Sequence, residues 1–510
     1  MGALGGRLGM AHPLRRSLHE HIRRWRGWVL ALVAMVAVVL PAGSGGASGA
    51  PWRVGTDPTF PPFEYRNAQN GAISGFDIDL MQAIGEETGH PIRWVPLPFD
   101  GLIPALQARS VDAAISAMTI TAQRSRAIDF SRPYFKAGQA IVVRDNGPAY
   151  EQLAQLQGRR IAVQIGTTGA LEASQVPGAK VSSFDSTPLA LQELANGNAD
   201  AVVSDVPAIL YAIDQAKLTG LRISGEHLST EFYGIALPMN SPITADVNRG
   251  LDALIRSGRY ADLYREWFAA DPADLPERAP ALDAASSPLA GLDLHVLALN
   301  LLKGAAITLM LTALSFSFGL MGGIALAVLL QAPWRLAHGL CRVYIDFFRG
   351  TPMLVQLFLI YFGLPALLQS MEVPFTINRL AAAVTALSLN VAAYLAETLR
   401  SGIESIDRGQ WEAADALGLS PLERMRFVIA PQALRRVLPP LANEFITLIK
   451  DTSLAAVIGF DELFRQGQLM VATTYRAFEI YIAVALVYLL MTTTASLLFK
   501  RLEARWQLPA

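Results

Sequence analysis

The sequence predicts a protein of two parts, a two-lobed α/β domain followed by an all-α transmembrane domain of about five spans. The 510-residue chain is 52% hydrophobic and only 17% charged, which is typical of a membrane protein with a sizeable soluble part. In its first half, short β-rich runs alternate with helical stretches, as in α/β domains. In its second half, apolar runs are long enough to cross a bilayer.

Charge and cysteine content narrow the function classes. The formal net charge of -1 gives no reason to expect a nucleic-acid partner, and the arginine clusters are explained by membrane topology. The single cysteine, Cys341, excludes an intrachain disulfide. The soluble part must therefore be stabilised by its core alone.

Residues 1–50 have the order of a secretory signal. Arginines between Arg15 and Arg24 precede a short apolar run, Trp28 to Leu40, and small residues follow up to Ala50. The segment is expected to be either a cleaved signal sequence or an uncleaved anchor. Both readings place the chain from Pro51 onward outside the cytoplasm.

Residues 51–270 are expected to form the extracytoplasmic domain. Helices are predicted at Ile78 to Thr88 and Thr187 to Asn196, and their alternation with strands favours parallel sheets with helices on both faces. Two extended runs, Gly138 to Arg144 and Phe232 to Pro238, are interpreted as strands that cross between two lobes. Lobe 1 would then comprise about 51–140 and 236–270, and lobe 2 about 141–235. The strands are expected at Trp52 to Gly55, Ile92 to Val95, Ala113 to Ser116, Ala140 to Val143, Arg160 to Gln164 and Ala201 to Ser204.

A Pro-, Ala- and Asp-rich linker, 271–295, leads to the membrane domain, 296–510. Arginine-rich loops follow the first and third spans and a basic tail follows the fifth, so these segments are predicted to face the cytoplasm. The five spans are expected at Lys303 to Gln331, Met353 to Ser370, Leu380 to Thr398, Leu438 to Gly459 and Phe478 to Phe499.

The polar stretch 400–436 is predicted to be a cytoplasmic helical hairpin. Gly418 supplies a residue suited to the positive φ that ends a helix. Ser420, Pro421 and Glu423 then form the start signal of the next helix, with a capping serine, a proline at the first position and a reciprocal glutamate.

This hairpin resembles the EAA loop of ABC import permeases, especially those of the polar amino-acid class. The matching residues are Glu412-Ala413-Ala414, Gly418, Pro431 to Arg435, Asn443 to Gly459 and Phe348 to Pro352. The resemblance implies a multi-pass protein of the bacterial cytoplasmic (inner) membrane that pairs with a second permease copy. It also implies a separate cytoplasmic ATPase dimer that docks on Glu412, Ala413, Ala414 and Gly418. Asn443, Glu444, Lys450 and Asp451 are expected either to face a partner or cavity or, for the last two, to mark the end of a span.

The first domain is similar to the solute-binding proteins for polar amino acids, family 3, with a type II arrangement of two lobes. The matching residues are Val54 to Glu64, Gly75 to Leu80, Asp112 to Arg124 and Asp129 to Tyr134. The whole chain thus looks like a fused binding-protein permease of the glutamine/glutamate type. The implied ligand is a polar amino acid.

The resemblance assigns roles to several residues. Arg124 would hold the ligand carboxylate through its planar guanidinium, with further donors from Thr119 and from the backbone around Ser116 to Met118. Asp205, at the end of a strand, would pair with the ligand ammonium or cap the following helix. Thr168, at a strand-to-helix turn, would add a donor or serve the turn alone.

Four further positions would contact the ligand side chain. Phe60 and Phe99 would sandwich it, or else pack only in the core. Asp57 could accept a hydrogen bond from an amide or pair with a basic group. Gln164 lies where some relatives carry a cation, so glutamine or another polar amino acid is favoured over glutamate.

Other functions are weighed against this one. Asp77 and Asp79 look catalytic in isolation but are interpreted as helix-capping residues. A ligand-gated amino-acid receptor or channel and a membrane-anchored, dehydratase-like enzyme remain the alternatives. The chain contains no GxxxxGK[ST] loop, so it is expected to bind no cofactor, with ATP and Mg held by the partner ATPase. No catalytic residue and no metal site are predicted.

Overall fold

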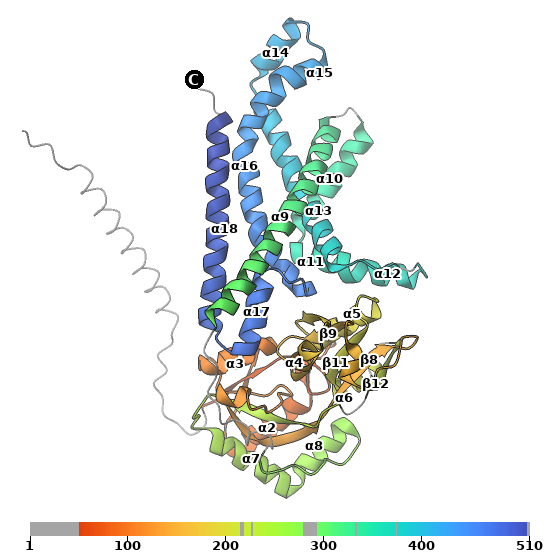
Figure 1. The fold of residues 1–510 in the computed structure, drawn as a ribbon, viewed down its shortest axis with the longest axis vertical. Coiled ribbons are helices and arrows are strands. Elements are labelled where there is room, and N and C mark those ends of the chain that lie inside the picture. The colour runs from red at the N-terminus through yellow and green to blue at the C-terminus, as the bar shows by residue number, and fades with distance from the viewer. Residues whose placement is uncertain are drawn as a thin grey trace, which may run out of the picture. The chain divides into compact units, whose positions relative to one another are not determined.

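The computed structural model describes residues 50–214, 219–225, 228–278, 293–331, 334–373 and 375–506. The expected signal or anchor therefore lies outside the described residues, as does most of the linker. The chain from Pro51 to Ala510 forms one compact unit. Figure 1 shows two sheets with their covering helices, followed by the long helices of the membrane domain.

Lobe 1 contains a five-stranded sheet in the order β5-β1-β6-β13-β7. Its strands are β1 (Trp52–Thr56), β5 (Ile92–Pro96), β6 (Ala113–Ala114), β7 (Asp129–Ala137) and β13 (Glu231–Leu237). A small sheet lies beside it, made of β2 (Thr59–Phe60), β3 (Glu64–Arg66) and β4 (Ile73–Ser74). The helices of this lobe are α2 (Phe76–Thr88), α3 (Phe99–Gln107), α7 (Thr244–Ser257) and α8 (Arg259–Phe268).

Lobe 2 contains a second five-stranded sheet in the order β10-β9-β11-β8-β12. Its strands are β8 (Gln139–Arg144), β9 (Arg160–Gln164), β10 (Lys180–Phe184), β11 (Ala201–Asp205) and β12 (Leu221–Gly225). Its helices are α4 (Thr168–Gln175), α5 (Thr187–Ala195) and α6 (Val206–Asp214). Buried aliphatic residues on both faces of this sheet form two clusters, so each face is covered.

The sheets differ from the prediction in direction and in their boundaries. Both are mixed, because β13 runs antiparallel to β6 and β7, and β8 runs antiparallel to β11 and β12. Strands β7 and β8 are joined by Gly138 alone, and they belong to different sheets. The two predicted crossing strands, β8 and β13, do not cross. Each lies within one lobe, and the chain passes between lobes at Gly138 and between Gly225 and Glu231.

The membrane domain is helical. Its elements are α9 (Leu294–Gln331), α10 (Arg335–Gly350), α11 (Met353–Phe358), α12 (Leu364–Ser370), α13 (Arg379–Glu404), α14 (Arg408–Ala416), α15 (Pro421–Glu423), α16 (Ala430–Asp451), α17 (Leu463–Thr474) and α18 (Ala477–Trp506). Helices α9 and α13 approach closely at Gly319 and Gly323, where an added Cβ would lie 2.8 Å from Val391 or Leu395. Small residues at this spacing allow two membrane helices to pack backbone to backbone.

Five spans were expected, and the described residues support fewer. Three helices, α9, α13 and α18, are long and apolar enough to cross a membrane, and there are four spans if the pair α10 and Met353–Leu368, bent by 109°, counts as one. The bend lies between Gly350 and Met353, so the expected span Met353 to Ser370 is the second arm of a bent pair, in which α11 continues through a π-helical segment (Leu359–Gly363) into α12. The expected span Leu438 to Gly459 falls on α16, whose prolines and charged residues lower its apolar character.

Candidate functional site

The predicted ligand residues gather at a small cavity between the lobes of the first domain. The cavity measures about 20 Å³. Eight of the ten predicted residues line it, together with Ala117 and Thr167: Phe60, Phe99, Ser116, Thr119, Arg124, Gln164, Thr168 and Asp205. Asp57 is absent from the lining and lies behind Gln164, to which its carboxylate is hydrogen-bonded. The Met118 side chain is not at the site, because it is buried in the hydrophobic core of lobe 1.

Arg124 joins the two lobes at this cavity. It begins a short 3-10 turn (Arg124–Arg126), and its side chain is almost completely buried. Its guanidinium donates to the Thr119 carbonyl of lobe 1 at 2.6 Å and to the Gly166 carbonyl of lobe 2 at 2.9 Å. The guanidinium carbon also lies 5.4 Å from the centre of the Phe99 ring, within cation–π range. Arg124 is therefore a buried residue between the lobes and not a surface arginine.

Asp205 faces the same cavity from the end of β11. Tyr233 of lobe 1 donates its hydroxyl to the Asp205 carboxylate, which makes a second contact between the lobes. Burial raises the pKa of Asp205 to about 7, and the nearby Glu231 adds to the rise, while the Tyr233 hydrogen bond opposes it. A ligand ammonium at this position would replace lost hydration and favour the charged carboxylate.

A buried carboxylate that the sequence analysis did not single out lies beside the two predicted threonines. Glu231, the first residue of β13, accepts hydrogen bonds from Thr119 at 2.6 Å and from Thr168 at 3.0 Å. The Gln139 amide donates to the same carboxylate at 3.0 Å. Thr168 and Gln139 belong to lobe 2, whereas Thr119 and Glu231 belong to lobe 1. Glu231 therefore holds the lobes together. The only feature of the sequence that could have indicated this role is that Glu231 is an acidic residue next to an expected crossing strand.

Asp57 and Gln164 form a third connection between the lobes. The Gln164 amide donates to Asp57 at 3.2 Å, and its carbonyl oxygen accepts from the Thr187 hydroxyl at 2.8 Å. Asp57 also accepts from the Phe99 backbone N–H at 3.1 Å. Burial raises the pKa of Asp57 to about 7. These polar groups lie at the end of the cavity that a ligand side chain would reach.

The loop that carries Ser116 and Ala117 is held by two buried carboxyl groups. The Ser116 hydroxyl donates to Glu64 at 2.8 Å, and the Ala117 N–H donates to Asp77 at 2.8 Å. Ala117 has a φ of 44°, a conformation that strongly favours glycine. Burial raises the pKa of both Glu64 and Asp77, and the Asp77 charge adds to the rise at Glu64. Burial therefore favours the protonated forms of these two neighbouring acids.

The predicted capping role of Asp77 is wrong. Helix α2 begins at Phe76, two residues before the expected start at Ile78, with Gly75 as its cap and no side-chain capping bond. A Cβ at Gly75 would lie 2.0 Å from the Phe63 carbonyl oxygen, so only glycine fits there. Asp77 consequently turns inward to Ala117 and to the Tyr134 hydroxyl, 2.7 Å away. Asp79 does not cap the helix either, since it accepts a hydrogen bond from the Trp267 indole at 2.9 Å.

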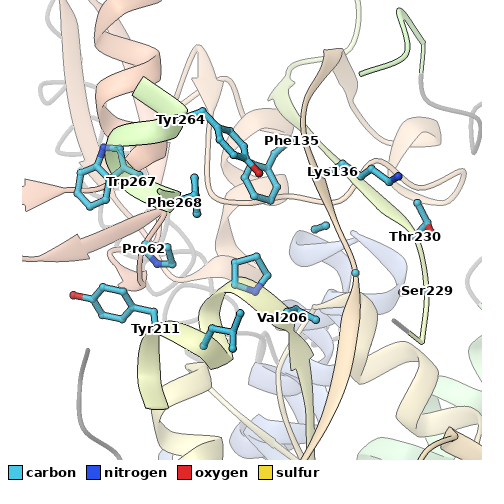
Figure 2. Close-up of a pocket in the computed structure, with 14 residues that line it drawn as sticks. Pro62, Phe135, Lys136, Val206, Tyr211, Ser229, Thr230, Tyr264, Trp267 and Phe268 are labelled. Atoms are coloured by element: carbon cyan, nitrogen blue, oxygen red, sulfur yellow. The ribbon is translucent and has the colours of Figure 1, made fainter. Parts of the chain in front are cut away.

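A larger cavity, about 640 Å³, lies against the connections between the lobes and shares no lining residue with the small one. Figure 2 shows its aromatic wall, with Tyr211 from α6 and Tyr264, Trp267 and Phe268 from α8. Lys136 is its single charged lining residue. A zwitterion needs both a cation and an anion as partners. The small cavity, with Arg124 and Asp205, is therefore the better candidate for amino-acid binding.

The small cavity has room for roughly one water molecule. With the Arg124, Asp205 and Glu231 connections in place, the lobes are closed on each other. An amino acid can therefore enter only when the lobes separate. The geometry of the site thus suits a ligand that binds while the lobes are apart and is enclosed when they close.

The predicted hairpin is present at the end of the membrane domain where α14 and α15 project beyond the neighbouring helices (Figure 1). Gly418 follows α14 with a φ of 73°, and Ser420 and Glu423 form a reciprocal capping box. Arg424 pairs with Asp415 and lies 5.2 Å from the centre of the Trp411 ring.

The hairpin also presents apolar side chains to its surroundings. Leu417, Leu422 and Phe427 are 78%, 77% and 64% exposed. Of the four predicted coupling residues, Glu412, Ala413 and Gly418 are exposed and Ala414 is buried. An apolar patch on a polar hairpin is typical of a protein-binding surface.

A further cavity of about 330 Å³ lies within the membrane domain. Glu444 and Asp451 of α16 line it with Asn390 and Tyr394 of α13. Glu444 and Asp451 therefore face a cavity, as expected for polar residues of this region. Asn443 and Lys450 are not part of the lining, and both are exposed.

Comparisons with known proteins match both parts of the chain. Residues 52–270 match the family model of bacterial extracellular solute-binding proteins, family 3, and residues 319–508 match that of binding-protein-dependent transport system inner membrane components. The second part is 44% identical over 209 residues to the glutamine transport system permease protein GlnP of Escherichia coli (strain K12), covering 41% of this chain and 93% of that protein. It is 42% identical over 199 residues to the probable amino-acid permease protein YxeN of Bacillus subtilis (strain 168), covering 39% of this chain and 88% of that protein. Among solved structures, an ancestral arginine-binding protein bound to arginine is 42% identical, with 43% of this chain and 98% of that chain covered and a TM-score of 0.42.

Proposed function

This chain belongs to the binding-protein-dependent transport system inner membrane components and carries a family 3 solute-binding domain in the same polypeptide, and from that premise we propose that it captures a polar amino acid and passes it across the membrane. It is the fused solute-binding and permease protein of an amino-acid ABC importer. The observation that carries the proposal is the pairing of a buried Arg124 and a buried Asp205 at one closed interlobe cavity. The transport role replaces the receptor and enzyme alternatives.

The ligand we propose is glutamine or a similar polar amino acid. Arg124 would bind the α-carboxylate with two parallel hydrogen bonds, and Asp205 would bind the α-ammonium. Phe60 and Phe99 would enclose the aliphatic part of the side chain. At the far end, the Gln164 amide can both donate to and accept from a ligand amide, whereas no lining residue there supplies a cation that would neutralise a carboxylate. Glutamate is therefore disfavoured. Because the Asp57 carboxylate lies directly behind Gln164, a basic amino acid is the competing ligand to test.

Transport requires partners that the chain itself does not supply. We propose that a separate cytoplasmic ATPase dimer binds ATP and Mg and docks on the exposed Leu417, Leu422 and Phe427 of the hairpin. A second permease copy would complete the translocation path. The protein would reside in the bacterial cytoplasmic membrane, with the binding domain on the outer, periplasmic side and the hairpin on the cytoplasmic side, in keeping with the distribution of arginines between the loops.

A ligand screen on the full chain tests this proposal. Purified protein in lipid nanodiscs is titrated by calorimetry with each common amino acid. We expect one tight class led by glutamine, with glutamate at least tenfold weaker. Cells that overproduce the chain with its ATPase should accumulate the same amino acid. Binding of no amino acid would overturn the proposed function, whereas tightest binding of arginine would overturn only the choice of ligand.

The pKa of Asp205 predicts that ligand affinity depends on pH. With the lobes closed on the small cavity, burial gives Asp205 a pKa of about 7, so below that pH its carboxyl holds a proton that must leave when an ammonium binds between the closed lobes. The dissociation constant should therefore rise as the pH falls below 7, by at most about tenfold for each pH unit, and be constant above it. Calorimetry between pH 5 and pH 8 measures this slope. Asp205→Asn should bind weakly with a flat profile, while Asp57→Asn should keep the slope; a slope retained in Asp205→Asn would contradict the assignment.

A further inference from the structure

One arginine of the membrane domain is completely buried against the solute-binding domain. Arg465, in the first turn of α17, has no exposed side-chain surface. Its guanidinium pairs with the Asp185 carboxylate of lobe 2 at 2.8 Å and donates to the Ser183 carbonyl of the same lobe. The N–H groups that begin α17 are capped by the Glu462 carboxylate, which fixes where Arg465 starts. A charge desolvated to this degree is stable only while its partners are present.

The position of Arg465 is at the mouth of the ligand cleft. Asp185 follows β10 in lobe 2, and Asp100 lies in the first turn of α3 in lobe 1. The lobes approach here, because a Cβ added at Gly166 of lobe 2 would lie 3.6 Å from the Asp100 Cα. Burial raises the pKa of Asp100, the Asp185 charge raises it further, and the Arg465 charge lowers it. Arg465 thus offsets the repulsion between two acids that closure brings together.

The other end of α17 contacts lobe 1. The Thr473 carbonyl accepts a hydrogen bond from the Gln123 amide at 2.6 Å. Tyr475, immediately after the helix, is buried in the cluster that contains Leu102 and Leu106 of α3. One helix therefore touches lobe 2 near its start and lobe 1 at its end.

We propose that α17 is a gauge of lobe closure, in which Arg465 and Tyr475 together fit the binding domain only when the lobes have closed on a ligand. Ten residues of helix hold the two contacts about 15 Å apart at a fixed spacing. Opening the lobes moves Asp185 away from Gln123 and Leu102, so an open domain can satisfy one end of α17 but not both. This inference rests on the proposed function, and it names the residues through which the membrane domain distinguishes a loaded binding domain from an empty one.

The proposal has a consequence for ligand affinity. If docking favours closed lobes, closed lobes and docking must stabilise each other reciprocally. Arg465 does not line the ligand cavity, yet its loss should weaken ligand binding in the full chain. A helix that merely supported the domain without reading its closure would leave the ligand dissociation constant unchanged.

Calorimetry on the full chain in lipid nanodiscs tests this, with L-glutamine or whichever amino acid binds tightest to the unaltered chain. Arg465→Gln should raise the dissociation constant about five- to fiftyfold. Asp185→Asn should have a similar effect, and the double variant should be no weaker than the worse single variant. Arg476→Gln, one residue beyond Tyr475, is the matched control and should bind as the unaltered chain does.

The outcomes separate the two hypotheses. Unaltered affinity in Arg465→Gln would overturn the closure gauge while leaving the proposed function in place. Equal losses in Arg465→Gln and Arg476→Gln would also overturn it, because the effect would then follow general loss of positive charge. Absence of amino-acid binding by the unaltered chain would overturn the proposed function and this inference with it.

Discussion

Replacing Arg124 with alanine is expected to weaken amino-acid binding by about 2 to 4 kcal/mol, roughly 30- to 1000-fold in the dissociation constant. The ligand carboxylate would be left in a buried cavity without its charged partner. The two carbonyl groups that Arg124 now satisfies, on Thr119 and Gly166, would also lose a donor, which weakens closure of the lobes. Calorimetric titration of the full chain with glutamine measures the change.

Two variants make the Arg124 experiment specific. Arg124→Lys keeps the charge but cannot place two parallel donors on a carboxylate, so it should bind with intermediate affinity. Arg126→Ala removes an arginine from the same 3-10 turn that does not line the cavity, and it should bind normally. Glutamine affinity within threefold of the unaltered chain in Arg124→Ala would eliminate Arg124 as the carboxylate ligand.

The main parts of the site could be predicted because stretches such as Asp112 to Arg124 resemble those of family 3 solute-binding proteins, and this resemblance implies the roles of their residues. An arginine after a buried run and an aspartate that ends a hydrophobic strand are both costly to bury without a partner. Phe60, Phe99 and Thr168, to which the same resemblance gives roles, also line the cavity, and each lies at the end or turn of a regular element.

What could not be predicted depends on contacts between segments far apart in the chain. Glu231 lies 112 residues from Thr119 and 63 from Thr168, and its role exists only when the lobes are closed. Asp77 follows the ordinary pattern of a helix start, and only the contact of Gly75 with Phe63 moves the cap and turns Asp77 inward. Local sequence patterns do not indicate packing between segments that are far apart in the chain.

The membrane domain likewise has some features that local sequence predicts and others that it does not. Local signals placed the hairpin correctly, because a capping box and a positive-φ glycine depend on residues within one turn. Spans were harder, because apolar content alone does not determine whether a helix continues. The apolar run after Met353 contains a π-helical segment and follows a sharp bend. Helix α16 contains three prolines, two of them in its interior, and several polar residues that face neighbouring helices or a cavity.

Replacing Gly418 with valine is expected to reduce ATP-driven uptake by at least tenfold while amino-acid binding stays normal. Gly418 has a φ of 73°, which a β-branched residue adopts only at a cost of about 1–2 kcal/mol, so the turn between α14 and α15 would be displaced. The space around Gly418 is open, because an added Cβ would meet no atom within 4 Å, and the expected effect therefore comes from backbone conformation alone. Gly418→Asn tests this directly, since asparagine tolerates positive φ and should retain uptake.

Gly339→Val is the matched control for Gly418→Val. Gly339 also has open space around its Cβ position, but it lies within α10 without a positive φ, so valine there should change uptake little. Uptake of radiolabelled amino acid into cells and calorimetry of the purified chain separate coupling from binding. A normal uptake rate in Gly418→Val would show that the hairpin tolerates a displaced turn, and the ATPase would then have to act through another surface. If binding and uptake both fail in Gly418→Val but not in Gly418→Asn, the turn instead supports the fold of the whole membrane domain.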